Sequence, residues 1–196
     1  MSPTAARPLR ADAERTVRAI LDAAERVLSE NPNATLEQIA EAAGVARTTV
    51  HRRFASREDL LRTMAVNAWR RIDAAIDAAR PQTAPPMVAL HQATANVIEI
   101  KYGVAYALDR VDETDPEVAA LQEAVFAKCD AALAHAQADG IIAADADLVW
   151  VRRVYIALIT ETVHGNTDLD GTADPDALAG RVIGTLLGGV GPARQR

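Results

Sequence analysis

Hydrophobic residues recur at intervals of three and four along most of the chain, which is the spacing of amphipathic helices. In residues 12–29 one such stripe carries Ile20, Leu21 and Leu28. Within residues 86–110 we expect a break near Gly103, because glycine weakens a helix interior. The same spacing predicts further long helices over residues 57–79, 116–138, 147–164 and 175–189.

The residues at the ends of these segments are those that start and stop helices. The run from Thr35 to Gln38 fits a capping box, and Ser56 stands in the same relation to Asp59. All nine prolines lie at the termini or between the periodic segments, where they do not interrupt a helix. No alternation of polar and apolar residues exceeds four positions, so we predict an all-α fold with about nine helices.

The composition narrows the class of protein further. The chain has 196 residues, of which 49% are hydrophobic and 4% aromatic. That hydrophobic fraction excludes a disordered chain, and the scarcity of aromatic residues argues against a large β fold. Cys129 is the single cysteine, so neither an internal disulfide nor a cysteine-based zinc site is expected. Neither a membrane-spanning run nor a signal peptide is visible, so we expect a cytoplasmic protein without a membrane partner.

Charge is distributed unevenly between two parts of the chain. The net charge is −6, yet residues 1–62 carry ten arginines against nine acidic residues. Residues 63–196 carry eleven basic and eighteen acidic residues. Between Gly44 and Arg57 there are four arginines and no acid, a local excess that indicates contact with an anion. We therefore expect one domain over residues 1–62 and a second over residues 63–196, joined by a helix rather than a flexible linker.

The segment over residues 35–57 has the pattern of a helix-turn-helix. Ala40 is small enough to let two helices cross closely, and Gly44 supplies the left-handed turn between them. The second helix, over residues 46–53, is then amphipathic and buries Val50. The segment is therefore predicted to place a short basic helix on the surface.

That short helix leaves six polar or basic side chains on its outer face. They are Arg47, Thr48, Thr49, His51, Arg52 and Arg53. Arginine can donate to both O6 and N7 of guanine, and threonine offers a hydroxyl and a methyl group to base edges. Thr35 and Arg57 begin the flanking helices, where backbone N–H groups and polar side chains suit phosphates. We predict these eight residues as a surface that binds double-stranded DNA.

Three strings in this region resemble the DNA-binding domain of the tetracycline-repressor (TetR) family of bacterial regulators. They are I-L-D-A-A-E-R-V-L at 20–28, A-T-L-E-Q-I-A-E-A-A-G-V-A-R-T-T-V-H-R-R-F at 34–54 and S-R-E-D-L-L at 56–61. The family usually has an aromatic residue at 51 and often at 53, with Gly or Pro near 48. This chain has His51, Arg53 and Thr48 there, differences that bear on the operator sequence rather than on the fold.

The resemblance implies a one-component transcriptional regulator. Residues 1–62 would form the helix-turn-helix domain, and residues 63–196 a bundle for ligand binding and dimerisation. We expect such a repressor to bind a pseudo-palindromic operator as a homodimer and to be released by a small, mainly apolar effector.

The last two helices, over residues 147–164 and 175–189, form the predicted dimer interface. Glycines recur every fourth residue at 180, 184 and 188, a spacing that lets helices pack closely. The apolar face of the final helix is made of Leu178, Val182, Ile183, Leu186 and Leu187.

The aromatic residues of the second part are the candidate lining of an effector pocket. They are Trp69, Tyr102, Tyr106, Phe126, Trp150 and Tyr155, with Glu161 and His164 as candidate polar contacts. An alanine-rich bundle packs tightly only where backbones come close, so bulky rings leave gaps more easily than they fill them. The acidic balance of residues 63–196 favours a neutral or cationic effector over an anion.

Two other classes of protein stay open at this point. Glu161 and His164 have the spacing of a di-iron ligand pair, which would suit an all-α enzyme with its site in the second part. The sequence holds no second such pair, no nucleophile–base arrangement and no phosphate-binding glycine loop, so we predict no catalytic residue, metal or cofactor. The other alternative is an architectural DNA-binding protein that takes no ligand.

Overall fold

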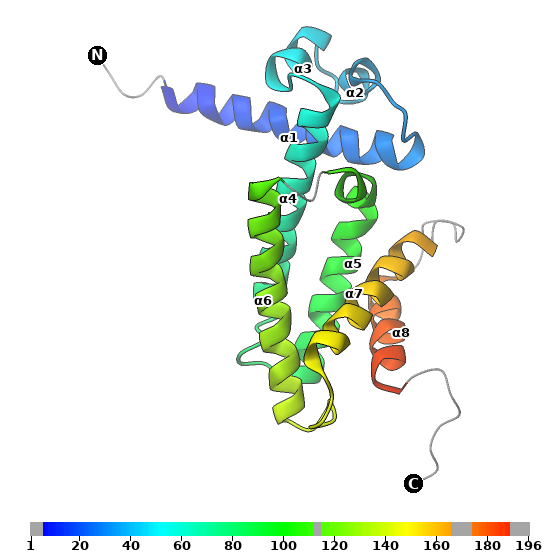
Figure 1. Ribbon diagram of the computed structural model, residues 1–196. Helices are drawn as coiled ribbons and strands as arrows, with labels where there is room; N and C mark the ends of the chain where they lie inside the picture. Colours follow the sequence, from blue (N-terminus) through cyan, green and yellow to red (C-terminus); the bar gives the residue numbers. More distant parts are fainter. Residues whose placement is uncertain (1–5, 112–114, 166–173, 189–196) are drawn as a thin grey trace. The chain divides into compact units, whose positions relative to one another are not determined.

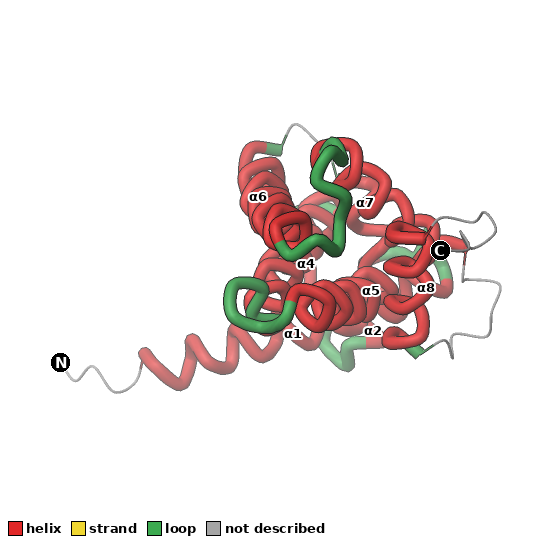
Figure 2. The backbone as a smooth tube through the Cα atoms, turned by 90° about the horizontal axis from the view of Figure 1, so that it is seen from below, coloured by secondary structure: helices red, strands yellow, loops and turns green. Residues whose placement is uncertain are grey.

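The computed structural model describes residues 6–111, 115–165 and 174–188, and in these residues all regular structure is helical (Figures 1 and 2). The all-α prediction is therefore confirmed. The eight described helices are α1 (Ala6–Glu30), α2 (Leu36–Ala42), α3 (Arg47–Arg53), α4 (Arg57–Ala78), α5 (Pro86–Arg110), α6 (Pro116–Ala138), α7 (Leu148–Gly165) and α8 (Pro175–Gly188).

The described helices number one fewer than the predicted nine or so because α5 does not break at Gly103. Helix α5 runs without interruption from Pro86 to Arg110. A Cβ atom on Gly103 would lie 3.1 Å from Oε2 of Glu25 in α1. The glycine thus serves a close approach between α5 and α1, and the break predicted from it was wrong.

The chain divides into two compact units. The first consists of residues up to Ala65 together with residues 103–112, and the second of residues 66–102 and those from 113 onward. Helices α4 and α5 each contribute one part to each unit. The domain boundary after residue 62 stays a prediction, although the end of α5 groups with the first unit.

The first unit is held by a core to which α1, α2, α3 and α4 all contribute. Ile20 of α1, Ile39 of α2, Val50 of α3 and Leu60 of α4 have no solvent-exposed surface, and Phe54 is 3% exposed. These residues pack in one cluster. Burial of each such side chain contributes about 1.5–3 kcal/mol to the stability of the folded unit. This burial holds the short helices α2 and α3 in place.

The second unit is a helical bundle seen end-on in Figure 2. Its largest cluster joins α5, α7 and α8 through Ile98, Tyr155, Ile159, Leu178 and Val182. Smaller clusters join α4 to α6, and the end of α6 to the loop and helix that follow. None of the described helices is long and apolar enough to cross a membrane.

Candidate DNA-binding face and ligand pocket

The α2–turn–α3 segment has the local structure that its sequence predicts. Thr35 caps α2: the Gln38 backbone N–H donates to the Thr35 hydroxyl, and the Thr35 N–H donates to the Gln38 side chain at 2.8 Å. Gly44 adopts φ +66°, the left-handed conformation that a side chain would disfavour. Val50 and Phe54 are buried beneath the turn. The Thr35 cap, the Gly44 turn and the buried Val50 and Phe54 together determine the orientation of α3 relative to α2.

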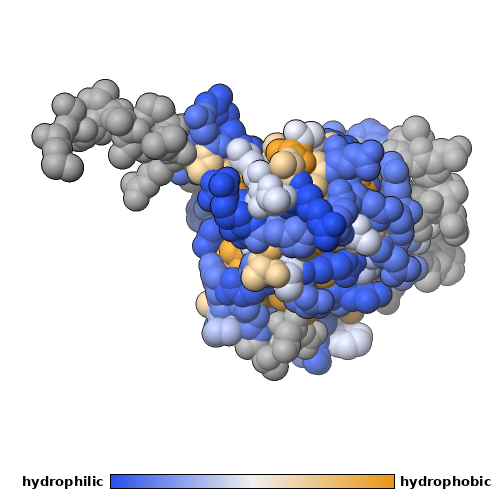
Figure 3. Space-filling view, turned by 90° about the horizontal axis from the view of Figure 1, so that it is seen from above, coloured by the Kyte–Doolittle hydropathy of each residue, from blue (hydrophilic) through white to orange (hydrophobic). Residues whose placement is uncertain are grey.

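Helix α3 presents most of its predicted DNA-contacting side chains to solvent. Arg47, Thr48, His51, Arg52 and Arg53 are exposed, whereas Thr49 is half-buried. Seen from above in Figure 3, the surface of the molecule on this side is mostly hydrophilic. Such a short basic helix on a polar surface is suited to the major groove and its flanking phosphates.

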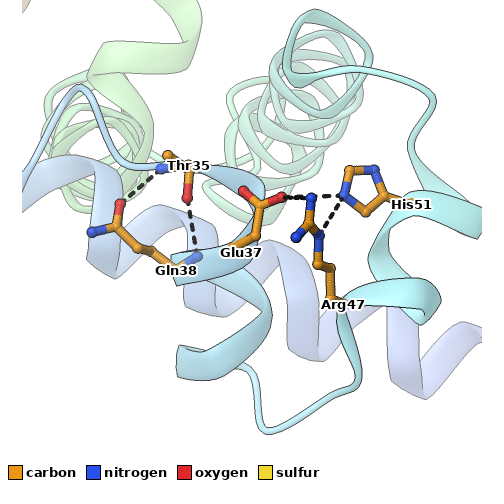
Figure 4. Close-up of polar contacts among 5 residues, drawn as sticks. All are labelled: Thr35, Glu37, Gln38, Arg47 and His51. Atoms are coloured by element: carbon orange, nitrogen blue, oxygen red, sulfur yellow. Dashed lines mark hydrogen bonds and ion pairs between the residues drawn. The ribbon is translucent and has the colours of Figure 1, made fainter.

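An acidic residue that the sequence reasoning missed lies among these basic side chains (Figure 4). The Glu37 carboxylate of α2 is 2.7 Å from the Arg47 guanidinium and 3.4 Å from Nε2 of His51. Arg47 Nε also donates to His51 Nε2 at 3.4 Å. Hydrogen bonds from the Glu37 backbone N–H and from Thr35, followed by contacts with His51 and Arg47, hold the pKa of Glu37 below its usual value. An ionised carboxylate thus holds two of the predicted DNA-contacting residues.

Arg57 is engaged inside the first unit. Its guanidinium donates to the carbonyls of Pro32 at 2.6 Å and Ala34 at 3.3 Å, and to the Tyr106 hydroxyl at 3.0 Å. It also lies over the Tyr106 ring, 5.5 Å from the centroid, and Arg110 lies 5.0 Å from the same centroid. Arg57 therefore braces the loop before α2 and the end of α5, a role that sequence spacing did not suggest.

The second unit contains a pocket between α4, α5, α6 and α7. Three of the predicted aromatic residues, Trp69, Phe126 and Tyr155, line it, and Trp69 and Phe126 meet edge to face with centroids 6.1 Å apart. Its cavity has a volume of about 90 Å³, well below the ~300–1,000 Å³ of typical small-molecule sites. A drug-sized occupant therefore requires side chains to move apart.

The polar groups around this pocket are few. The Tyr155 and Thr94 hydroxyls hydrogen-bond to each other at 2.7 Å, and Thr94 donates to the Leu90 carbonyl. Burial raises the pKa of the Cys129 thiol to about 12, with a smaller contribution from nearby Asp130. Lys101 is the one charged residue among the described residues of the lining. The pocket is thus apolar apart from one amine.

The remaining predicted ligand contacts lie elsewhere. Tyr106 belongs to the first unit, and Trp150 is 63% exposed. The Tyr102 hydroxyl donates to the Thr162 carbonyl at 3.5 Å. Glu161 borders a second hollow between α7 and α8, whereas His164 is exposed, with its Nδ1 2.8 Å from the Thr160 carbonyl. The structure therefore brings three of the eight predicted residues into the pocket between α4, α5, α6 and α7.

The helix-turn-helix region matches a known family. Residues 20–64 match the model of bacterial regulatory proteins of the tetR family. The HTH-type transcriptional repressor LfrR of Mycolicibacterium smegmatis is 46% identical over 87 residues, which are 44% of this chain and 46% of LfrR. The matched stretch thus spans about half the length of that relative.

Solved structures resemble the chain over most of its length. The TetR-like regulator LfrR from Mycobacterium smegmatis in complex with proflavine is 30% identical and has a TM-score of 0.76, covering 91% of this chain and 98% of that one. The regulator FadR from Bacillus subtilis in complex with stearoyl-CoA shares the fold, with 21% identity, a TM-score of 0.69, and coverage of 89% and 99%.

A helix-turn-helix with its basic second helix exposed, followed by a helical bundle, defines the class of DNA-binding regulators with a separate second domain. Together with these matches, it shows that the chain belongs to the tetR family of bacterial regulatory proteins. The protein is accordingly a DNA-binding transcriptional regulator.

Replacing Glu37 should lower the specificity of the protein for its operator over unrelated DNA. In Glu37→Gln, Arg47 and His51 are without their carboxylate partner and become free for any nearby phosphate. We expect binding to unrelated duplex to tighten about two- to fivefold, the strength of an exposed ion pair, and to tighten less on the operator. Fluorescence anisotropy at fixed salt measures both.

Glu41→Gln is the matched control for this experiment, because Glu41 is also an exposed carboxylate of α2. It removes the same charge and should shift both affinities equally. If the two variants alter the operator-to-unrelated ratio alike, or if Glu37→Gln still alters it when Arg47 is methionine, Glu37 does not act through Arg47.

Arg57→Met should lower stability. The variant leaves the Pro32 and Ala34 carbonyls and the Tyr106 hydroxyl without their donor, at an expected cost of about 1–3 kcal/mol in the free energy of unfolding. Urea denaturation measures it, with the exposed Arg26→Met as the control. Unchanged stability together with a shallower salt dependence of DNA binding would instead make Arg57 a phosphate contact.

Cys129 should react slowly with a thiol reagent such as DTNB in the folded protein. Because its pKa is raised to about 12, the reactive thiolate is scarce at pH 8. The rate should be at least about a hundredfold below that of free cysteine, and should keep rising with pH beyond 9. A rate in native buffer equal to that in urea would contradict the burial of the Cys129 thiol.

Proposed function

We propose that the protein is a repressor that binds a pseudo-palindromic operator as a homodimer and leaves it when a small, mainly apolar effector enters the second unit. The observation that carries this proposal is the pairing of an exposed basic helix, α3, in one unit with an apolar pocket in the other. The relative LfrR is named a transcriptional repressor, and its structure holds proflavine. A regulator of this kind acts where bacterial DNA lies, in the cytoplasm.

On DNA, α3 is the element that enters the major groove. Arg47 lies at its start, where recognition helices contact base edges. Arg52 and Arg53 lie at its end, and we assign them to base edges or to the adjoining phosphates. The hydroxyl of Thr35 accepts from the Gln38 backbone N–H at the start of α2, and we assign it to a phosphate contact there.

Dimerisation involves the outer sides of α7 and α8. The apolar residues Leu178, Val182 and Ile183 face the core of their own unit, so they do not form the dimer face. On the other side of α8, a Cβ atom at Gly184 or Gly188 would meet open space, and Leu187 is 39% exposed. That side allows the close approach of a second copy of α8.

Helix α4 is the mechanical connection in this proposal. It begins at Arg57 in the first unit, and its later residues Trp69, Ile72 and Ile76 line the pocket. An effector that enlarges the pocket displaces these side chains and with them the helix. The resulting change in separation of the two reading helices of the dimer lowers affinity for the operator.

Selection of bound duplexes from a random pool tests sequence recognition. We expect a palindromic consensus for the wild type, because a two-fold dimer places two copies of α3 on related half-sites. Arg47→Ala or Arg52→Ala should weaken operator binding by about 1–3 kcal/mol for each base that the arginine binds, and should relax preference at one position per half-site. Unchanged preference in both variants would contradict base readout by α3.

The selected duplex also distinguishes a repressor from the two alternatives, an architectural DNA-binding protein and an enzyme. Footprinting on the selected duplex should protect a short site, whereas an architectural protein protects DNA broadly. An effector should raise the melting temperature of the protein, because it binds the folded state, and should release the duplex in a gel-shift assay. Consumption of the added molecule would support an enzyme in place of a regulator.

A further inference from the structure

A surface hollow adjoins one wall of the apolar pocket. It has a volume of about 270 Å³ and lies between α6 and the turn that joins α4 to α5. Two residues, Pro81 of the turn and Ala132 of α6, line both the hollow and the pocket. The other residues of the hollow are Gln82, Ala131 and His135, of which the first two are exposed. At this point the pocket is therefore separated from solvent by the residues that the two spaces share.

The His135 side chain of α6 holds the turn at this wall. Its Nδ1 lies 3.1 Å from the Pro81 carbonyl oxygen, and because a carbonyl can only accept, Nδ1 is the donor. The other ring nitrogen, Nε2, lies 4.0 Å from the exposed carboxylate of Asp139. The net contribution of one neutral hydrogen bond to stability is small, so the contact between His135 and Pro81 breaks at a modest cost in free energy.

The turn also contains a strained backbone position. Among the described residues other than glycine, only Arg80 has a positive φ, at +50°. This left-handed conformation is unfavourable for a residue with a Cβ atom, so a movement of the turn that changes it relieves strain. The Thr83 and Ala84 N–H groups both donate to the Arg80 carbonyl at 3.0 Å. Rotation about φ of Arg80 leaves these two bonds intact, because its carbonyl lies on the turn side of that rotation.

We propose that the effector enters the pocket through this wall, when the turn over residues 79–85 moves outward and the hydrogen bond between His135 and Pro81 breaks. Joined, the two volumes of about 90 and 270 Å³ fall within the ~300–1,000 Å³ of typical small-molecule sites. The inference deepens the proposed function and rests on it only for the entering molecule being the effector. The route itself depends on the turn and on α6.

Cys129 is the reporter of entry, because it lines the pocket and is the single cysteine of the chain. Burial of its thiol raises its pKa to about 12, so its reaction in the folded protein reports access to the buried side of α6. The probe is N-phenylmaleimide, an uncharged and mainly apolar thiol reagent. Mass spectrometry measures the labelling rate at one pH for all variants.

Filling the hollow should slow the labelling of Cys129. Ala131→Trp and Gln82→Trp each place a large ring at a residue that lines the hollow but not the pocket, and we expect each to lower the rate severalfold. Ala127→Trp is the matched control, because Ala127 is an exposed alanine of α6, one turn earlier and outside both linings. It should leave the rate unchanged.

Removing the contact at the wall should speed the labelling. His135→Phe keeps a ring without the donor, and we expect the rate to rise about two- to tenfold, the effect of one lost hydrogen bond. His91→Phe is the control, because His91 is also a half-buried histidine but lies outside both linings. Asp139→Asn removes the partner at 4.0 Å and should leave the rate unchanged.

Two further measurements separate movement of the turn from unfolding of the protein. Low concentrations of urea should not accelerate labelling of the wild type or of His135→Phe, because opening of one turn exposes little surface, whereas global unfolding exposes much. Arg80→Asn should slow labelling, because asparagine tolerates a positive φ better than arginine and so stabilises the closed turn.

Two results would overturn the proposal: a labelling rate that both tryptophan variants of the hollow leave unchanged, or a rate that His135→Phe leaves unchanged in a folded protein. A gel shift with the labelled protein tests the proposed function separately, because the group attached to Cys129 occupies the pocket and should release the selected duplex. Labelled protein that keeps its full affinity for the duplex, with labelling rates as expected, would refute the repressor mechanism alone. Release of the duplex without any effect of the hollow variants would refute the route alone.

Discussion

The hydrogen bonds made by the Arg57 guanidinium join three segments of the first unit that are far apart in the sequence. A cation at the first residue of a helix is unfavourable next to the positive end of the helix dipole. Here it is compensated, because the guanidinium reaches two carbonyls of the loop before α2 and the hydroxyl of Tyr106. The planar guanidinium presents five donors in a fixed fork, whereas the three donors of lysine all lie on one nitrogen. The start of α4, the entry to α2 and the end of α5 are thereby held around one side chain.

Those features of the fold that depend on neighbours in sequence were predictable. The spacing of apolar residues located the long helices, and the residues from Thr35 to Gly44 identified both the cap and the turn. Gly103 shows where such reasoning ends. The lack of a Cβ atom at Gly103 makes room for the Glu25 side chain, which is nearly eighty residues away in the sequence. The residues next to Gly103 do not indicate whether the glycine makes such room or breaks the helix.

The candidate site likewise contains residues whose positions follow from the local sequence and residues whose positions depend on the fold. Exposure of Arg47, Arg52 and Arg53 followed from the period of one helix. The position of Glu37 next to Arg47 depends on the turn between α2 and α3, so the sequence did not indicate it. Tyr106 does not line the predicted pocket, because residues 103–112 belong to the first unit. Lys101 was not predicted, because the sequence argument for the pocket depends on aromatic side chains. Its helical spacing from Val97 and Ala93 was the available signal.

The small volume of the pocket constrains how any effector acts. A ligand shifts a conformational equilibrium only by the difference between its affinities for the two states. A cavity of about 90 Å³ is smaller than a drug-sized molecule needs, so in the proposed mechanism such a molecule favours a state in which the pocket is larger. Helix α4 supplies Trp69, Ile72 and Ile76 to the lining and Arg57 to the hydrogen bonds of the first unit, so in the proposed mechanism enlargement of the pocket acts on a helix that begins in the DNA-binding unit. In that mechanism, the tight packing of the pocket without ligand is what couples effector binding to DNA binding.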